Sequence, residues 1–86
     1  MYNVLKRDGK IVDFDIAKIR DAVKLAFEAC EKDFNDSVID FIALRVTADF
    51  EPKIKDSHIA VEDIQDSVEE VLSQAGYSDV AKAYIL

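Results

Sequence analysis

The residues best suited to binding chemistry are five basic side chains near the start of a chain that is otherwise strongly acidic. They are Lys6, Arg7, Lys10, Lys18 and Arg20. Residues 1–20 hold five bases and three acids, a formal charge of +2, whereas residues 21–86 hold six bases and fifteen acids, a charge of −9. A local basic cluster can hold a small anion, while a net charge of −7 disfavours nucleic acid and anionic membranes as partners.

Lys18 is the most unusual of these residues because of its position in a predicted helix. Asp15 is a good N-cap, which makes Lys18 the third helical residue, where a capping box would have Glu or Gln. A cation there opposes the helix dipole at a cost of about 0.3–1 kcal/mol, and a bound phosphate would relieve that conflict. Taken alone, Lys18 could instead turn out to water or pair with Asp15 or Asp21.

Lys6 and Arg7 are adjacent residues at the end of a predicted strand. Neighbouring strand residues point to opposite faces, so both reach one ligand only if the strand twists near its turn. The alternative is a solvated hairpin tip. The three cations Lys6, Arg7 and Lys18 together favour a ligand, because they belong to one hairpin–helix unit and so lie close in space.

Other chemical groups are sparse. The single cysteine, Cys30, excludes an intramolecular disulfide and a cysteine-based zinc site, and we expect an inert, buried thiol. A hydrolase using Asp13, Asp15 and His58 is the weakest hypothesis, because no P-loop or nucleophile motif accompanies these residues. We therefore predict no catalysis and no metal bound by protein side chains. No apolar run approaches about 20 residues, which favours a cytoplasmic protein without a signal peptide.

The start of the chain predicts a β-hairpin with strands at residues 2–7 and 10–14. Asp8-Gly9 between them is typical of a two-residue type I′ turn, in which both central residues have positive φ. A lone hairpin is marginally stable in water, so it must pack on another element. Residues 58–61 can add a third strand.

Helical spacing of apolar residues predicts four helices. The first follows Asp15, the second starts at residues 36–37 and ends near Pro52, the third covers residues 62–75 before Gly76, and the fourth starts at Ser78. The predicted inward residues are Ile16, Ile19, Val23, Ala26, Phe27, Cys30, Val38, Ile39, Ile42, Val46, Phe50, Ile64, Val68, Val71, Leu72, Val80, Ala81, Tyr84 and Ile85. Phe41 and Leu44 widen the apolar stripe of the second helix, which we expect to be the most buried.

Several segments of this chain resemble the ATP-cone family. Val4-Leu5-Lys6-Arg7-Asp8-Gly9, Phe14-Asp15 and Lys18-Ile19 resemble its N-terminal signature. Ile64-Gln65-Asp66-Ser67-Val68-Glu69 and the closing Val80-Ala81-Lys82-Ala83-Tyr84-Ile85-Leu86 resemble its later segments. The resemblance covers residues 1–86 as a single domain. It implies an α+β fold in which a small β-hairpin or three-stranded sheet forms a lid on a four-helix bundle.

The resemblance also implies a regulatory function. Members of this family bind ATP or dATP and act as on/off sensors of ribonucleotide reductases, where ATP leaves the enzyme active and dATP switches it off. We therefore expect an N-terminal fragment of a larger reductase, whose partners are its catalytic domain, other subunits or a second cone. Residues 83–86 look most like the cone of anaerobic, glycyl-radical ribonucleoside-triphosphate reductases.

The resemblance assigns the phosphate-binding role by position. Lys6, Arg7 and Lys18 would bind the phosphates of ATP or dATP, with Mg²⁺ as the accompanying ion. Val4 would approach the nucleotide through its backbone and packing, and Val61 belongs to the same predicted set.

The base-binding role is assigned in the same way. Ile19 would pack near the base, and Asp15 stands where a polar residue can read the adenine amino group. Val12 replaces a glutamate that contacts adenine in some relatives, and Asp13 is one residue out of phase with it, so the base contact here is expected to be main-chain. Gln65 stands where relatives can have a nucleotide-contacting histidine.

A different class of function is also compatible with the composition. A small, acidic, helical interaction module would dock a basic partner protein. It would have no nucleotide affinity, and its complex would weaken strongly with salt.

Overall fold

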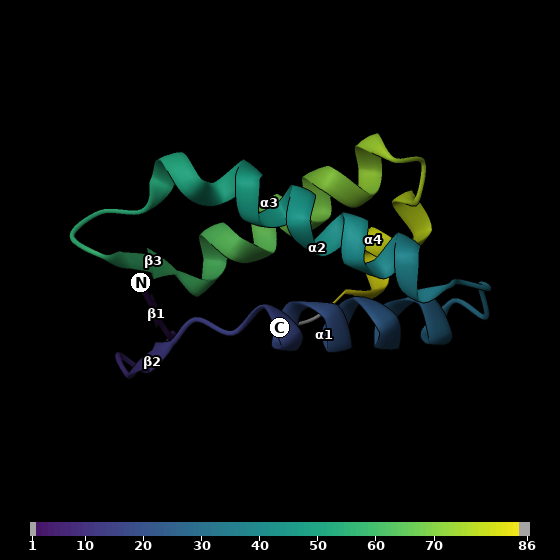
Figure 1. Cartoon of the computed structure of the whole chain (residues 1–86). Helices are drawn as coiled ribbons and strands as arrows, with labels where there is room; N and C mark the ends of the chain where they lie inside the picture. The colour runs from purple at the N-terminus through teal and green to yellow at the C-terminus, as the bar shows by residue number, and fades with distance from the viewer. Residues whose placement is uncertain (1, 85–86) are drawn as a thin grey trace.

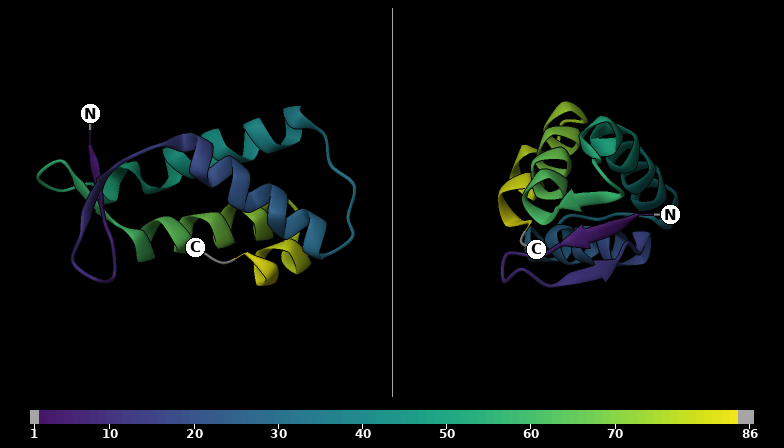
Figure 2. Two further views of the ribbon diagram at one scale, coloured as in Figure 1. Left: turned by 90° about the horizontal axis from the view of Figure 1, so that it is seen from below. Right: turned by 90° about the vertical axis from the view of Figure 1, so that its left-hand side faces the viewer.

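The computed structural model describes residues 2–84 and shows a small sheet at one end of four helices (Figure 1). This arrangement confirms the predicted α+β fold. The elements in chain order are β1 (Asn3–Leu5), β2 (Ile11–Asp13), α1 (Ile16–Ala29), α2 (Asp36–Phe50), a 3₁₀ turn η1 (Glu51–Lys53), β3 (His58–Ala60), α3 (Val61–Gln74) and α4 (Ser78–Ala83). Viewed end-on, the strands lie across the end of the helices like a lid (Figure 2).

The sheet has the strand order β2-β1-β3, so the first strand of the chain lies at its centre. β1 pairs antiparallel with β2, where Val4 lies opposite Val12, and parallel with β3, where Val4 lies opposite Ile59. The predicted third strand is therefore present. It ends at Ala60 rather than at residue 61, because Val61 already begins α3.

The hairpin turn differs from the predicted two-residue type I′ turn. The Lys6 backbone N–H donates to the Lys10 carbonyl at 2.8 Å, and the Gly9 N–H donates to the Lys6 carbonyl at 3.0 Å, which leaves a three-residue loop. Within this loop only Gly9 has positive φ, at 87°, while Asp8 does not. A tight turn followed by one left-handed glycine is a common three-residue hairpin, and it spares Asp8 a strained conformation. The strands are correspondingly shorter than predicted.

The helix starts follow local hydrogen bonding. The predicted N-cap is confirmed for α1, where the Ala17 N–H donates to Asp15 Oδ1 at 3.0 Å. Asn35 caps α2 in the same way, through a 2.9 Å bond from the Val38 N–H. α3 has no side-chain cap and instead has acidic residues in its first turn. Gly76, with φ of 91°, ends α3 as expected of a residue after a helix.

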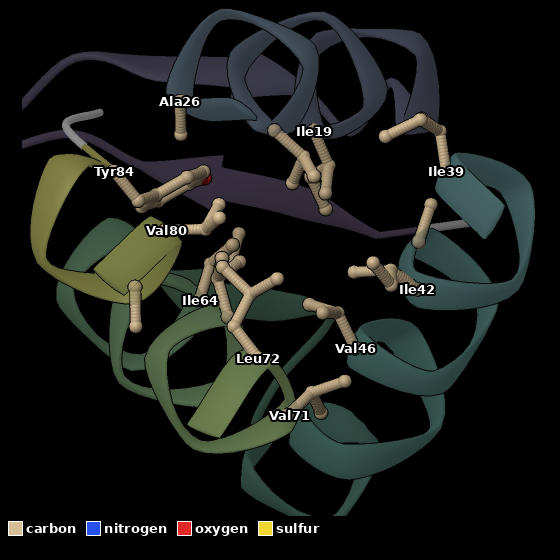
Figure 3. Packing of buried hydrophobic residues seen from close by; sticks show 14 of the residues in the cluster. Ile19, Ala26, Ile39, Ile42, Val46, Ile64, Val71, Leu72, Val80 and Tyr84 are labelled. Atoms are coloured by element: carbon tan, nitrogen blue, oxygen red, sulfur yellow. The ribbon is translucent and has the colours of Figure 1, made fainter. Parts of the chain in front are cut away.

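The hydrophobic core lies between the four helices, and Figure 3 shows side chains from all of them converging on its centre. Ile19 of α1, Ile42 of α2, Leu72 of α3 and Val80 of α4 are each no more than 3% exposed. Burial of such side chains stabilises a fold by roughly 1.5–3 kcal/mol each. Rings then connect this core to the sheet, since Tyr2 and Phe14 pack on each other and on Phe50.

The prediction that Phe41 and Leu44 widen the buried stripe of α2 is wrong. Phe41 is 57% exposed and Leu44 is 64% exposed. The core-facing side of α2 is defined by Ile39, Ile42 and Val46, and residues 41 and 44 lie on the other side of the helix. Apolar type alone did not distinguish the two faces.

The end of the bundle farthest from the sheet joins α1 to α4. Cys30 is the half-buried C-cap of α1, and its Sγ lies 3.4 Å from the Asp79 carbonyl. Lys32 Nζ contacts Asp79 Oδ2 at 2.9 Å, and this hydrogen bond lowers the pKa of Asp79. Tyr84 follows α4 as its C-cap rather than lying within it, and burial raises the pKa of its phenol. The predicted inward position Ile85 lies outside the described residues.

Candidate functional site

A cleft of about 390 Å³ opens between the sheet and the N-terminal ends of α1 and α3. Its volume is in the range of clefts that bind small molecules. The residues that line it are Val4, Lys6, Arg7, Asp8, Val12, Asp13, Phe14, Asp15, Lys18, Ile19, Val61 and Ile64. The elements that build it are therefore the hairpin, the start of α1 and the first turn of α3, which are brought together because β3 pairs with β1 and leads directly into α3.

Eight of the nine site residues predicted from the sequence line this cleft. The ninth, Gln65, lies beside it and accepts a 2.8 Å hydrogen bond from Arg7 Nη2. The sequence did not single out Asp8, Phe14 or Ile64 as wall residues. Ile64 could have been found from its predicted inward position, because an inward residue in the first turn of α3 also lies at the end of the bundle.

The floor of the cleft is apolar. Val4 is 8% exposed, and its cross-strand neighbour Val12 is half-buried on the same face of the sheet. Ile19 and Ile64 approach from the two helices, and each is 3% exposed. Val61 completes this surface. A flat aromatic ring could bury its faces here without leaving polar groups unpaired.

The rim of the cleft has the three predicted cations, Lys6, Arg7 and Lys18. Lys6 and Arg7 both reach it because β1 ends at Leu5, so the alternation rule for strands no longer applies to the residues that follow. Lys18 is in the first turn of α1 and is exposed. The sequence left open whether both residues of the Lys6-Arg7 pair could face one ligand, and the turn geometry places both at the cleft.

Lys6 and Lys18 make no ion pair with any carboxylate of residues 2–84, in contrast to five other basic residues. This excludes the alternative in which Lys18 pairs with Asp15 or Asp21. The two ammonium groups are therefore available to an external anion. The first-turn N–H groups and dipole of α1 favour an anion at the same place.

Arg7 differs from the two lysines because it is already bound to side chains of α3. Its Nε lies 3.5 Å from Glu62 Oε1 in the first turn of α3, and its Nη2 donates to Gln65 Oε1. Gln65 in turn donates to Glu69 Oε1 at 3.3 Å. The Arg7 and Glu62 side chains are both more than half exposed, so this ion pair is solvated and weak.

Three carboxylates also line the cleft and balance the formal charge of the three cations. Two of them are engaged locally. Asp8 accepts from the Lys10 backbone N–H at 3.0 Å and lies 3.9 Å from Lys10 Nζ, and Asp15 caps α1 through Oδ1. Oδ2 of Asp15 remains as a hydrogen-bond acceptor, to which an amino group of a ligand could donate.

The candidate hydrolase set is not brought together. Asp13 and Asp15 line the cleft, whereas His58 does not and pairs with Asn3 in the sheet. Among residues 2–84 there is also no group of three or more His, Cys, Asp or Glu side chains placed to hold a metal ion. In the same part of the chain, none of the helices is both long and apolar enough to cross a membrane. An apolar floor with cations at its rim instead suits a ligand with an aromatic ring and an anionic group.

Comparison with known proteins identifies the family of this chain. The family model described as "ATP cone domain" matches residues 2–86. The vitamin B12-dependent ribonucleoside-diphosphate reductase of Mycobacterium tuberculosis strain H37Rv is 41% identical over 86 residues, which cover 96% of this chain and 11% of that protein. The ribonucleoside-diphosphate reductase subunit alpha of Chlamydia muridarum is 34% identical over 92 residues, covering 98% of this chain and 9% of the relative.

A third relative, the ribonucleoside-diphosphate reductase subunit alpha of Chlamydia pneumoniae, is 38% identical over 90 residues. These 90 residues cover 96% of this chain and 8% of the relative. This chain thus spans about a tenth of the length of the curated relatives that it matches.

Proposed function

Because this chain belongs to the ATP-cone family, we propose that it binds ATP or dATP in the cleft between its sheet and its helices, as a regulatory domain without catalysis of its own. The observation that carries this proposal is the pair of ammonium groups of Lys6 and Lys18, which make no ion pair within residues 2–84 and lie at the rim of an apolar cleft. A nucleotide has the matching parts, a flat base and a highly charged phosphate chain.

The proposed pose follows the polarity of the cleft. The adenine ring lies on the apolar floor, near Val12 and Ile19, and its amino group donates to Oδ2 of Asp15. The phosphates extend to Lys6 and Lys18 at the N-terminus of α1, together with Mg²⁺. The absence of a glutamate at position 12 leaves the remaining base contacts to main-chain groups of the hairpin.

Val4, Val61, Arg7 and Gln65 complete the proposed site. Val4 and Val61 supply apolar walls from β1 and α3. Arg7 adds a third cation for the phosphates. Gln65 either contacts the nucleotide directly or positions Arg7 through their hydrogen bond.

The regulated enzyme in this proposal is a ribonucleotide reductase, because the relatives named above are reductase chains. The binding partners are then its catalytic domain, its other subunits or a second cone, in the cytoplasm. The relatives are ribonucleoside-diphosphate reductases, one of them vitamin B12-dependent. They give no support to the expected anaerobic triphosphate reductase, so we propose a reductase without assigning its class.

Isothermal titration calorimetry of this chain with ATP, dATP and GTP, each with Mg²⁺, tests the proposal. We expect ATP and dATP to bind at the same site and to compete, and GTP to bind more weakly, because its carbonyl cannot donate to Asp15. No binding of either adenine nucleotide would contradict the proposal. A salt-sensitive complex with a basic protein, in the absence of nucleotide binding, would instead support the acidic interaction module.

A further inference from the structure

We propose that Glu62 lowers the nucleotide affinity of this domain, because it is an internal counter-ion of Arg7 that the phosphates of the ligand must displace. The inference rests on the proposed function, because the displacing anion is the nucleotide. It assigns a role to Glu62, which does not line the cleft and whose effect is exerted through Arg7.

The first observation is the unequal state of the three rim cations. Lys6 and Lys18 make no ion pair with carboxylates of the described residues, whereas Arg7 is 3.5 Å from Glu62 and is also hydrogen-bonded to Gln65. Arg7 therefore bridges the hairpin and the first turn of α3, which both contribute residues to the lining of the cleft. An anion that enters the cleft therefore meets Lys6 and Lys18, which have no carboxylate partner within residues 2–84, and Arg7, which is already paired.

The second observation is the position of Glu62 in its helix. It lies in the first turn of α3, where the helix dipole favours a negative charge and no side-chain cap competes for the terminal N–H groups. The helix dipole therefore favours Glu62 near this helix end even when Arg7 binds a phosphate instead. Gln65, one turn later, is a neutral acceptor and opposes the phosphates much less.

The third observation is the exposure of the pair. The Arg7 side chain is 58% exposed and that of Glu62 is 53% exposed, so their attraction is screened by water. A triphosphate offers the guanidinium several anionic oxygens and two-point hydrogen bonding, which is the stronger arrangement. Exchange of Glu62 for a phosphate as the partner of Arg7 is therefore favourable. The free energy that the Arg7–Glu62 pair contributes in the free protein is lost in this exchange and lowers the nucleotide affinity by that amount.

The test compares two variants that each remove one negative charge from the first turn of α3. Glu62→Gln removes the negative charge that pairs with Arg7, whereas the control Asp63→Asn changes a residue that makes no ion pair within residues 2–84. We expect Glu62→Gln to bind ATP about two- to fivefold more tightly than the unmodified chain, as the strength of exposed ion pairs implies. Asp63→Asn should change the affinity less, and AMP should show a smaller gain than ATP.

A second measurement repeats the comparison in an Arg7→Ala background, where the gain from Glu62→Gln should disappear. Equal gains for the Glu62 and Asp63 variants, or a gain that persists without Arg7, would overturn the inference in favour of general charge repulsion. Weaker or unchanged ATP binding by Glu62→Gln would overturn it as well. If the unmodified chain itself binds no adenine nucleotide, the proposed function fails, which is a separate result.

Discussion

Two helix N-termini face the same cleft, and their first turns have opposite charges. α1 starts with the side-chain cap Asp15, has no acidic residue in its first turn, and has Lys18 there. α3 starts without a side-chain cap and has Glu62 and Asp63 in its first turn. The dipole of α3 is thus compensated by carboxylates of its first turn, whereas α1 has the carboxylate of its cap, Asp15, and a cation in its first turn.

The difference indicates that the N-terminus of α1, rather than that of α3, is suited to bind an anionic ligand. A lysine in the first turn lowers the stability of the free helix, and it gains a favourable partner only when an anion binds. The carboxylates of α3 do the reverse, since they stabilise their helix and repel an anion. Arg7 lies between the two ends and is bound to the acidic one in the free protein.

The largest effect is expected when the α1 end is made like the α3 end. Lys18→Glu replaces the proposed phosphate-binding cation with an anion, so we expect ATP affinity to fall by about 100-fold or more, on the scale of a charge-assisted hydrogen bond that is lost and replaced by repulsion. The free energy of unfolding should rise by about 0.3–1 kcal/mol, because the new charge suits the helix dipole. Calorimetry with ATP and urea denaturation measure the two quantities.

Lys82→Glu, which makes the same charge reversal on α4, provides the control for overall charge. It should change ATP affinity by much less than Lys18→Glu. Similar losses in both variants would mean that the comparison of the two helix ends does not explain binding.

A smaller effect is expected from exchanging the caps of the two helices. Asp15→Ala removes the bond to the Ala17 N–H and should lower the free energy of unfolding by about 1 kcal/mol. Ala60→Ser introduces a capping hydroxyl at a residue that already has the extended backbone of an N-cap, with φ −72° and ψ 142°, and should raise it. The expected gain is about 0.5–1 kcal/mol. Urea denaturation measures both variants.

Asp15→Asn is the matched control, since asparagine caps a helix as well as aspartate does. Its stability should stay within about 0.5 kcal/mol of the unmodified chain. A loss as large as that of Asp15→Ala would mean that the charge of Asp15, rather than its cap, stabilises α1.

Much of the fold could be predicted from the sequence because local physical rules agree with one another. Asp15 is both a strong cap and the residue before an apolar helical pattern, and Gly76 ends α3 in the left-handed conformation that glycine favours. The inward residues of α1 and α3 recur at helical spacing. Where residue type and spacing conflicted, as at Phe41 and Leu44 on α2, the prediction was wrong, because apolar type does not show which face other helices cover.

The candidate site was predictable for residues that are close in sequence and less so for contacts across the chain. Lys6 and Lys18 could be grouped because a hairpin leads directly into α1. The pairing of Arg7 with Glu62 depends on the parallel pairing of β1 with β3, which joins segments more than fifty residues apart. No local pattern in the sequence encodes that contact.

The most direct test of the account is to map the amides perturbed by ATP in a ¹⁵N-labelled sample of this chain by nuclear magnetic resonance. The account predicts the largest shifts at the Arg7–Gly9 turn, at Lys18 and Ile19, and at residues 61–65, with small shifts at residues 41–45 on the outer face of α2. Shifts centred on α2 or α4, or none at saturating ATP, would contradict the claim that the cleft between the two helix ends is the nucleotide site.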